Sequence, residues 1–150
     1  MWQANLAEIN LGRSVVQKAN LCEANLSGAT LWRTDLCGSS LVQADCRRAL
    51  LIRANLNQTI LSESLFVDAE MRLISLVDAD LQGADLSGAN LSYADLSSAN
   101  LRGANLERTV LIGANLVGTN LTSTNLAKAI ASRTDLRQAI LPKKVGLLSS

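Results

Sequence analysis

Residues 84–103 read ADLSG, ANLSY, ADLSS and ANLRG, four five-residue units with one shared pattern. Each unit starts with a small residue, continues with Asn or Asp and then Leu, and ends with two variable residues. Extended in both directions, the pattern gives 28 Leu positions between residues 6 and 141, of which 23 are Leu. The five exceptions are uncharged: Val16, Cys46, Phe66, Met71 and Ala131. A repeat of this length decides the fold before any other feature does.

The other positions of the unit are also regular. Two residues before the Leu position there are 17 Ala, 6 Thr, 3 Ser and 2 Ile, and the residue directly before it is Asn or Asp in 17 of 28 units. Seven of the nine Gly lie two residues after the Leu position, where a type II turn needs a positive φ. The pattern therefore indicates a turn in every unit. We expect the Asn and Asp columns to serve backbone hydrogen bonding rather than catalysis.

A period of five fits neither regular secondary structure. In an α-helix, successive Leu residues would be rotated by about 140° and would form no stripe. In a straight strand they would alternate between the two faces. A chain that turns once per unit can place every Leu inside a coil. The alternative is a helical bundle rich in Ala and Leu, but Asn, Asp, Ser, Thr and Gly at fixed positions argue against it.

The units resemble the A(D/N)LXX consensus of the pentapeptide-repeat family over residues 4–143. The resemblance implies an all-β fold, a right-handed quadrilateral parallel β-helix (a solenoid) with four pentapeptides per coil. About seven coils at a spacing of about 4.8 Å would form a rod roughly 34 Å long. The Leu and the small residue would point inward, and the other three residues would point outward.

The expected domain organisation is a β-helix over residues 1–143 and a C-terminal tail over 144–150. Val145, Leu147 and Leu148 would fold over the last coil as a cap. The resemblance implies a capping helix at the N-terminus in many members and dimerisation through a terminus. Because the repeat begins at Ala4, we expect a longer parent chain or a homodimer that forms by end-to-end stacking.

A twenty-residue coil predicts which side chains are vertical neighbours in the core. Cys46 and Phe66 are twenty residues apart, so the large side chain is predicted to fill the volume that the small one leaves. The predicted structural core includes Leu26, Cys46, Phe66, Leu86, Leu91 and Leu96.

Composition limits the function. The 150 residues are enough for one domain, and the absence of His removes the commonest general base and metal ligand. No nucleophile motif, phosphate loop or metal-ligand cluster occurs, so we expect no enzyme activity, cofactor, metal or small-molecule substrate. No apolar run is long enough for a membrane helix, and no membrane association is expected. Three unpatterned Cys fit a reducing compartment, which favours a cytoplasmic, bacterial protein.

Charge is distributed unevenly although the net charge is only +1. One of the four faces carries five Arg and one Glu, which give it a net charge of +4, and we name it the basic face. It consists of the outward residues around Leu11, Leu31, Leu51, Met71, Leu91, Leu111 and Ala131. The acidic face, around Val16, Leu36 and their successors, carries Asp35, Asp78, Asp95 and Asp135 against Lys18 and Arg137. The candidate partner-binding residues of the basic face are Arg13, Trp32, Arg33, Ile52, Arg53, Arg72 and Tyr93.

Two interpretations of the basic face are open. Trp, Tyr and Arg are enriched at binding hot spots, and exposed aliphatic residues mark interaction surfaces. Such aliphatic residues are expected at Leu50, Ile52, Val110 and Ile112. Alternatively, outward aliphatic residues only satisfy strand propensity, with Arg stems lying over them.

The leading functional hypothesis is a non-catalytic protein-interaction, scaffold or regulatory module with an unidentified protein partner. The resemblance implies one alternative, because some family members look like duplex DNA and inhibit DNA gyrase. Those members are strongly acidic, whereas this chain has a net charge of +1 and four scattered Asp on its acidic face. A further alternative is weak nucleic-acid binding through the basic face, with Trp32 and Tyr93 stacking on bases.

Overall fold

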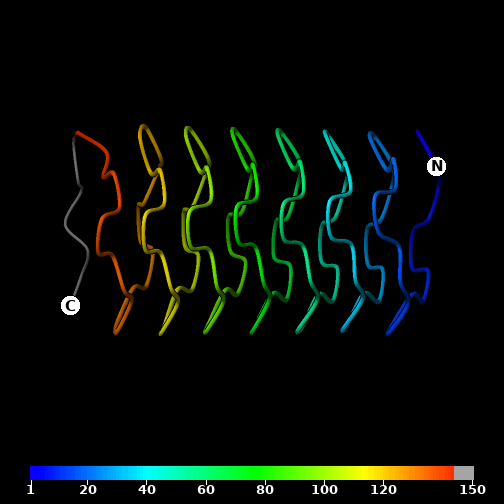
Figure 1. Cartoon of the computed structure of the whole chain (residues 1–150), viewed down its shortest axis with the longest axis horizontal. Coiled ribbons are helices and arrows are strands. Elements are labelled where there is room, and N and C mark those ends of the chain that lie inside the picture. The colour runs from blue at the N-terminus through cyan, green and yellow to red at the C-terminus, as the bar shows by residue number, and fades with distance from the viewer. Residues whose placement is uncertain (144–150) are drawn as a thin grey trace.

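The computed structural model describes residues 1–143, which form a right-handed quadrilateral β-helix (Figure 1). The coils follow one another along a single axis, from the blue N-terminal end to the red end of the described chain. Within these residues there is no helix, and each strand is a single bridged residue at every fifth position. Parallel bridges join each such residue to the one twenty positions further on, from Asn5↔Asn25 to Asn120↔Ile140. One coil therefore takes twenty residues.

Backbone hydrogen bonds account for four of the five N–H groups in a unit. The Leu6 N–H donates to the Asn25 carbonyl at 2.7 Å, and the Glu8 N–H donates to the Ser27 carbonyl at 2.9 Å. The Ile9 N–H closes the turn on the Leu6 carbonyl at 3.2 Å. The residue before each Leu donates back to the preceding coil. Only the N–H directly after the Leu lacks a backbone acceptor.

Asn and Asp supply that missing acceptor. All 17 Asn and Asp residues directly before the Leu position accept, through Oδ1, the N–H two residues further on, at 2.9–3.3 Å. This is the Asx turn. Neighbouring coils are joined in the same column, as where Asn100 Nδ2 donates to Asp80 Oδ1 at 3.0 Å. The columns thus satisfy the backbone, as the sequence pattern indicates.

The second variable position of the unit has a positive φ at every fifth residue from Gln3 to Gln138. Seven of these residues are Gly, with φ of 65–70°, and the other 21 have φ of 52–63°. None of the 21 is Val, Ile or Thr, whose branched Cβ disfavours this conformation. Val42 and Ile52 occupy the preceding position, where φ is not positive. Glycine therefore indicates the turn position, but the absence of branched residues defines it.

The inward side chains form one continuous apolar column. Leu6, Leu11 and Val16 are only half-buried, because the first coil has a neighbour on one side only. Inward hydroxyls are satisfied: Thr109 Oγ1, for example, donates to the Leu86 carbonyl at 2.8 Å. No buried side-chain nitrogen or oxygen within residues 1–143 lacks a partner. The residues named above as structural core are all fully buried: Leu26, Cys46, Phe66, Leu86, Leu91 and Leu96.

Cys46 and Phe66 lie in consecutive coils of one column. Asp45 is bridged to Leu65, and the Cys46 N–H donates to the Leu65 carbonyl at 2.7 Å. Both side chains are fully shielded from solvent. The twenty-residue register thus places the undersized residue next to the oversized one.

The last inward residues surround an apolar hollow of about 20 Å³ at the C-terminal end of the column. Leu126, Ala131 and Leu136 are half-buried there, and Leu141 is exposed. The cap expected from Val145, Leu147 and Leu148 lies outside the described residues. End-to-end stacking into a homodimer stays a prediction.

Candidate functional site

Trp32 lies at the centre of an ordered group on the basic face. Its indole covers Gly12: a Cβ added at residue 12 would come within 2.6 Å of Trp32 Cδ1. The Cζ of Arg13 is 4.5 Å from the ring centroid, and the Cζ of Arg33 is 5.8 Å away, both within cation–π range. Because Gly12 has no side chain, the half-buried indole can hold two guanidinium groups beside it.

Arg13, Arg33 and Arg53, which we name the arginine row, occupy the same turn position in consecutive coils. Their backbones are therefore spaced by about 4.8 Å along the axis. None of the three forms an ion pair with any residue of 1–143. The one acid of this face, Glu70, is engaged by Arg72, with 3.4 Å between Oε2 and Nε. Stacked like charges repel one another, so the row is complementary to an anionic partner.

The same part of the face lacks the Asx acceptors. Thr30, Leu50 and Glu70 stand directly before the Leu position in three consecutive coils. The N–H two residues after each of them has no acceptor among residues 1–143. Other interruptions of the Asn and Asp columns leave the same N–H without an acceptor, as at Val42 and Ser62, but without an arginine row beside it. In the 17 units with Asn or Asp, a surface side-chain oxygen reaches this N–H from outside the coil, so the three groups on the basic face also face outward. We name them the open N–H groups, and they belong to Trp32, Ile52 and Arg72.

The apolar surface of the basic face differs from the expectation. Leu50 is 42% exposed and Leu73 is 46% exposed, so these two flank the arginine row with aliphatic surface. Ile52, Val110 and Ile112 were expected to be exposed but are half-buried, because neighbouring coils cover them. The remaining candidate residues are exposed: Arg13, Arg33, Arg53, Arg72 and Tyr93.

Three of the four Asp residues on the acidic face are engaged by neighbouring side chains. Asp35 accepts from Asn55 Nδ2 at 2.9 Å, and Asp95 accepts a matching bond at 3.0 Å. Asp135 pairs with Arg137 at 2.6 Å. The hydrogen bond from Arg137 lowers the pKa of the Asp135 carboxyl below its ordinary value. This face therefore presents few free carboxylates.

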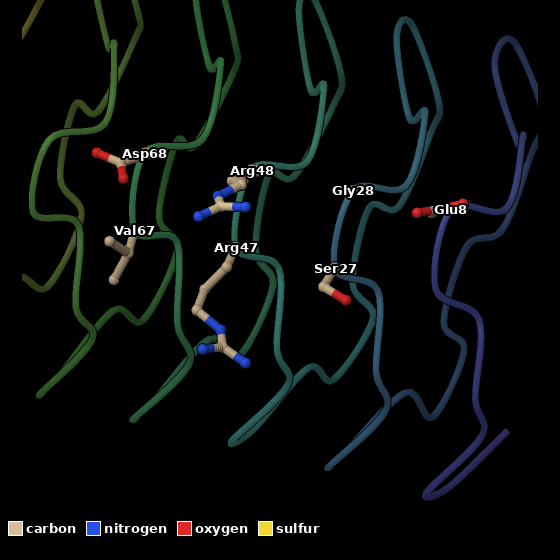
Figure 2. A pocket seen from close by; sticks show the side chains of 7 residues that line it. All are labelled: Glu8, Ser27, Gly28, Arg47, Arg48, Val67 and Asp68. Carbon is tan, nitrogen blue, oxygen red and sulfur yellow. The ribbon is translucent and has the colours of Figure 1, made fainter.

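An open groove of about 450 Å³ lies on the face that covers the Cys46 and Phe66 column (Figure 2). It exists because Ser27 and Gly28 are small, while longer side chains stand in the adjoining coils. The sequence-based prediction omits it, although small residues twenty positions from charged ones are a readable signal. The lining residues are Glu8, Ser27, Gly28, Arg47, Arg48, Val67 and Asp68.

The groove combines charges of both signs without a catalytic arrangement. Arg47 contacts Asp45 at two points, with Nε 2.8 Å from Oδ1 and a second nitrogen 2.5 Å from Oδ2. This side-chain hydrogen bond lowers the pKa of the Asp45 carboxyl.

Residues 1–143 contain no group of three or more His, Cys, Asp or Glu that could hold a metal ion. No helix of the described chain is long and apolar enough to cross a membrane.

The three cysteines should differ in reactivity. Cys46 is fully buried, and burial raises the pKa of its thiol to about 12, so it is protonated at neutral pH. Cys22 and Cys37 are half-buried. We expect iodoacetamide to modify only Cys22 and Cys37 in the folded protein and all three in denaturant, as measured by intact mass.

The same burial gives a pH dependence. Because the folded pKa of Cys46 lies above its unfolded value, its contribution to stability is complete below the unfolded pKa. That contribution falls as the pH rises toward about 12. In the iodoacetamide experiment, modification of Cys46 in the folded protein as fast as that of Cys22 would contradict the buried placement of Cys46.

These observations define a solenoid of five-residue units whose outer faces offer side chains for contact. The family model described as pentapeptide repeats (8 copies) matches the chain at residues 4–43, 33–68, 44–75, 69–108 and 104–141. The chain belongs to the pentapeptide repeat family. No curated protein gives a significant match.

Two solved structures with TM-scores above 0.5 share the fold. The pentapeptide repeat protein alr5209 from Nostoc PCC 7120 is 34% identical over 63% of this chain and 78% of its own, with a TM-score of 0.57. Trypsin-treated QnrB1 (R167E), a plasmid-mediated fluoroquinolone resistance protein, is 19% identical over 93% and 87%, with a TM-score of 0.55. HetL, involved in heterocyst differentiation regulation in Nostoc sp. PCC 7120, is 23% identical over 95% and 92%, with a TM-score of 0.43.

Proposed function

We propose that this chain is a non-catalytic protein-interaction module, of scaffold or regulatory type, that binds a cytoplasmic protein partner through its basic face. The observation that carries the proposal is the stack of Arg13, Trp32 and Arg33. Its charges have no internal ion pair within residues 1–143, and exposed Leu50 and Leu73 lie nearby. Arg and aromatic residues with adjoining apolar surface supply most of the energy in protein interfaces.

Strand propensity alone does not account for this group. It explains outward Ile and Val, but it does not explain an indole that occupies the space over a glycine between two arginines. Ordering three long side chains costs conformational entropy. Binding of a partner gives this arrangement a role that an isolated surface does not have.

DNA mimicry directed at gyrase is less well supported. A mimic of duplex DNA presents a continuous row of negative charge. Here Asp35, Asp95 and Asp135 are each engaged by a neighbouring side chain, and the net charge is +1. The likeness to QnrB1 at 19% identity concerns the fold alone.

Affinity capture from the producing organism tests the proposal. The immobilised chain is compared with a Trp32→Ser/Arg33→Ser variant and with a control, Arg102→Ser/Val117→Ser. The control also removes one arginine and one apolar side chain, but from other faces. We expect the Trp32/Arg33 variant to retain a specific partner at least about tenfold less than the natural chain, because a hot spot is worth about 2 kcal/mol or more.

Quantitative mass spectrometry of the captured proteins gives the comparison, and thermal melts verify that each variant is folded. The control should retain the partner as the natural chain does. Equal retention by all three proteins would show that the basic face is not the interface.

A further inference from the structure

We propose that the basic face binds an acidic segment of its protein partner, whose carboxylates engage the arginine row and the open N–H groups together. This inference rests on the proposed function and adds the chemistry of the partner. It draws on two features of the same face that overlap in the coils of residues 31–33 and 51–53: cations without internal ion pairs and backbone donors without acceptors.

The open N–H groups indicate what kind of atom is missing. In 17 units a side-chain oxygen of Asn or Asp occupies the place in front of this N–H. On the basic face that place is empty of Asx oxygens in three consecutive coils, where the chain has Thr30, Leu50 and Glu70. A carboxylate of a partner carries the same acceptor as Asp, so it can complete the turn from outside.

The arginine row adds charge next to these donors. Guanidinium groups bind carboxylates through two parallel hydrogen bonds, which makes Arg the preferred residue for acidic motifs. Every second side chain of an extended peptide is about 6.6–6.8 Å from the next, whereas the coils are about 4.8 Å apart. Flexible Arg side chains can span this difference. A segment lying along the solenoid axis would therefore contact more than one coil.

Trp32 prepares the site for binding. It holds Arg13 at 4.5 Å and Arg33 at 5.8 Å from its ring centroid before any partner arrives. Prior ordering of side chains lowers the entropy lost on association. The stack therefore favours a partner with closely spaced acids.

The surroundings favour a peptide over a nucleic acid. Binding of single-stranded nucleic acid relies on aromatic rings that are free to stack on bases. The indole of Trp32 instead lies on Gly12 with a guanidinium over the ring. Exposed Leu50 and Leu73 next to the row offer aliphatic contacts, which suit a segment that combines acidic and apolar residues.

Fluorescence anisotropy with defined probes tests the inference. The probes are a labelled peptide of alternating Glu and Ala, its counterpart with Gln for Glu, and a labelled oligothymidylate, each at low ionic strength. We expect only the Glu peptide to bind. Arg13→Gln/Arg33→Gln/Arg53→Gln should weaken this binding at least about tenfold. Arg102→Gln/Arg108→Gln/Lys128→Gln removes the same charge from other faces and should change it by less than about twofold.

A second variant isolates the open N–H groups. Thr30→Asn/Leu50→Asn gives two of these groups an internal acceptor, so it should weaken peptide binding by about threefold or more without lowering Tm. Leu50→Thr removes the leucine without supplying a carbonyl oxygen. Ile60→Asn makes the same kind of repair on another face. Ile60→Asn should bind the Glu peptide as the natural chain does, and Leu50→Thr, which loses only an aliphatic contact, should weaken binding less than Thr30→Asn/Leu50→Asn does.

Several outcomes overturn the inference. The first two concern the probes: the Glu peptide does not bind, or oligothymidylate binds more tightly than the Glu peptide. The other two concern the variants: the two charge-removing triple variants weaken binding equally, or the Asn substitutions leave binding unchanged. The proposed function has a separate readout. If the Trp32→Ser/Arg33→Ser variant still loses its captured partner, the basic face is an interface whose partner has a different chemistry.

Discussion

Leu91→Asp is expected to abolish cooperative folding of the central coils. Leu91 is fully buried in the middle of the column, and its N–H donates to the Val110 carbonyl at 2.8 Å. A carboxylate at this place would be surrounded by Leu and Ala side chains, with no cation among the buried residues of the described chain. Burying an unpaired charge or polar group costs several kcal/mol, and we expect a loss above about 4 kcal/mol.

The size of the effect follows from the architecture. Coils of a solenoid contact only their neighbours, so a central defect separates the two halves of the column. Urea unfolding followed by far-UV circular dichroism measures the loss. Ser98→Asp is the matched control, because Ser98 is exposed and Asp tolerates its positive φ of 58°. This control should change stability by less than about 0.5 kcal/mol. A Leu91→Asp protein that unfolds like the natural chain would contradict an inward Leu column.

The fold could be predicted because two simple rules exclude the alternatives. A period of five places Leu on one side of neither a helix nor a strand, so a turn in each unit follows from geometry. The twenty-residue coil could not be derived this way, because a period of five fits coils with any number of sides. The family resemblance supplied that number, and the bridges from residue i to residue i+20 confirm it.

The candidate site could be predicted only in part. With the register known, the sequence places Arg13, Arg33 and Arg53 in one row. The spacing of residues does not determine a side chain's rotamer, so the contact of Trp32 with Gly12 could be found only in the structure. The expectation of an exposed Ile52 overlooked the cover that adjoining coils give to the residue directly after the Leu position.

The open N–H groups show why a residue pattern alone was insufficient. The sequence records that Thr30, Leu50 and Glu70 interrupt the Asn and Asp columns. The meaning of the interruption depends on knowing that this side chain is the acceptor for one specific N–H. Once the hydrogen-bond scheme of the unit is known, an interruption such as Leu50 identifies a backbone donor open to a partner, unless another side chain reaches it, as Asn57 Oδ1 reaches the Val77 N–H at 2.9 Å.

Phe66→Ala is expected to destabilise the chain by about 3–5 kcal/mol. Phe66 is the largest fully buried side chain of the described residues, and it lies one coil from Cys46. Cys46 is smaller than the Leu that usually occupies its position, so the column has less side-chain volume there. Because the coils are held in register by backbone hydrogen bonds on all sides, they cannot collapse to fill the resulting cavity. Equilibrium unfolding in urea gives the free energy of unfolding for comparison with the natural chain.

Cys46→Leu tests whether the two side chains share that volume. In the natural chain the added atoms have no space, so this substitution should destabilise by about 1–3 kcal/mol. In the Phe66→Ala background the same leucine fills part of the cavity, and the double variant should recover about 1–3 kcal/mol relative to additivity. The control pairs Cys46→Leu with Leu106→Ala, a buried residue of the same column three coils away, for which the two effects should add. If the two side chains share one volume, the cost of one substitution must depend on whether the other is present. Additive effects for the Cys46 and Phe66 pair would therefore show that the two side chains pack independently.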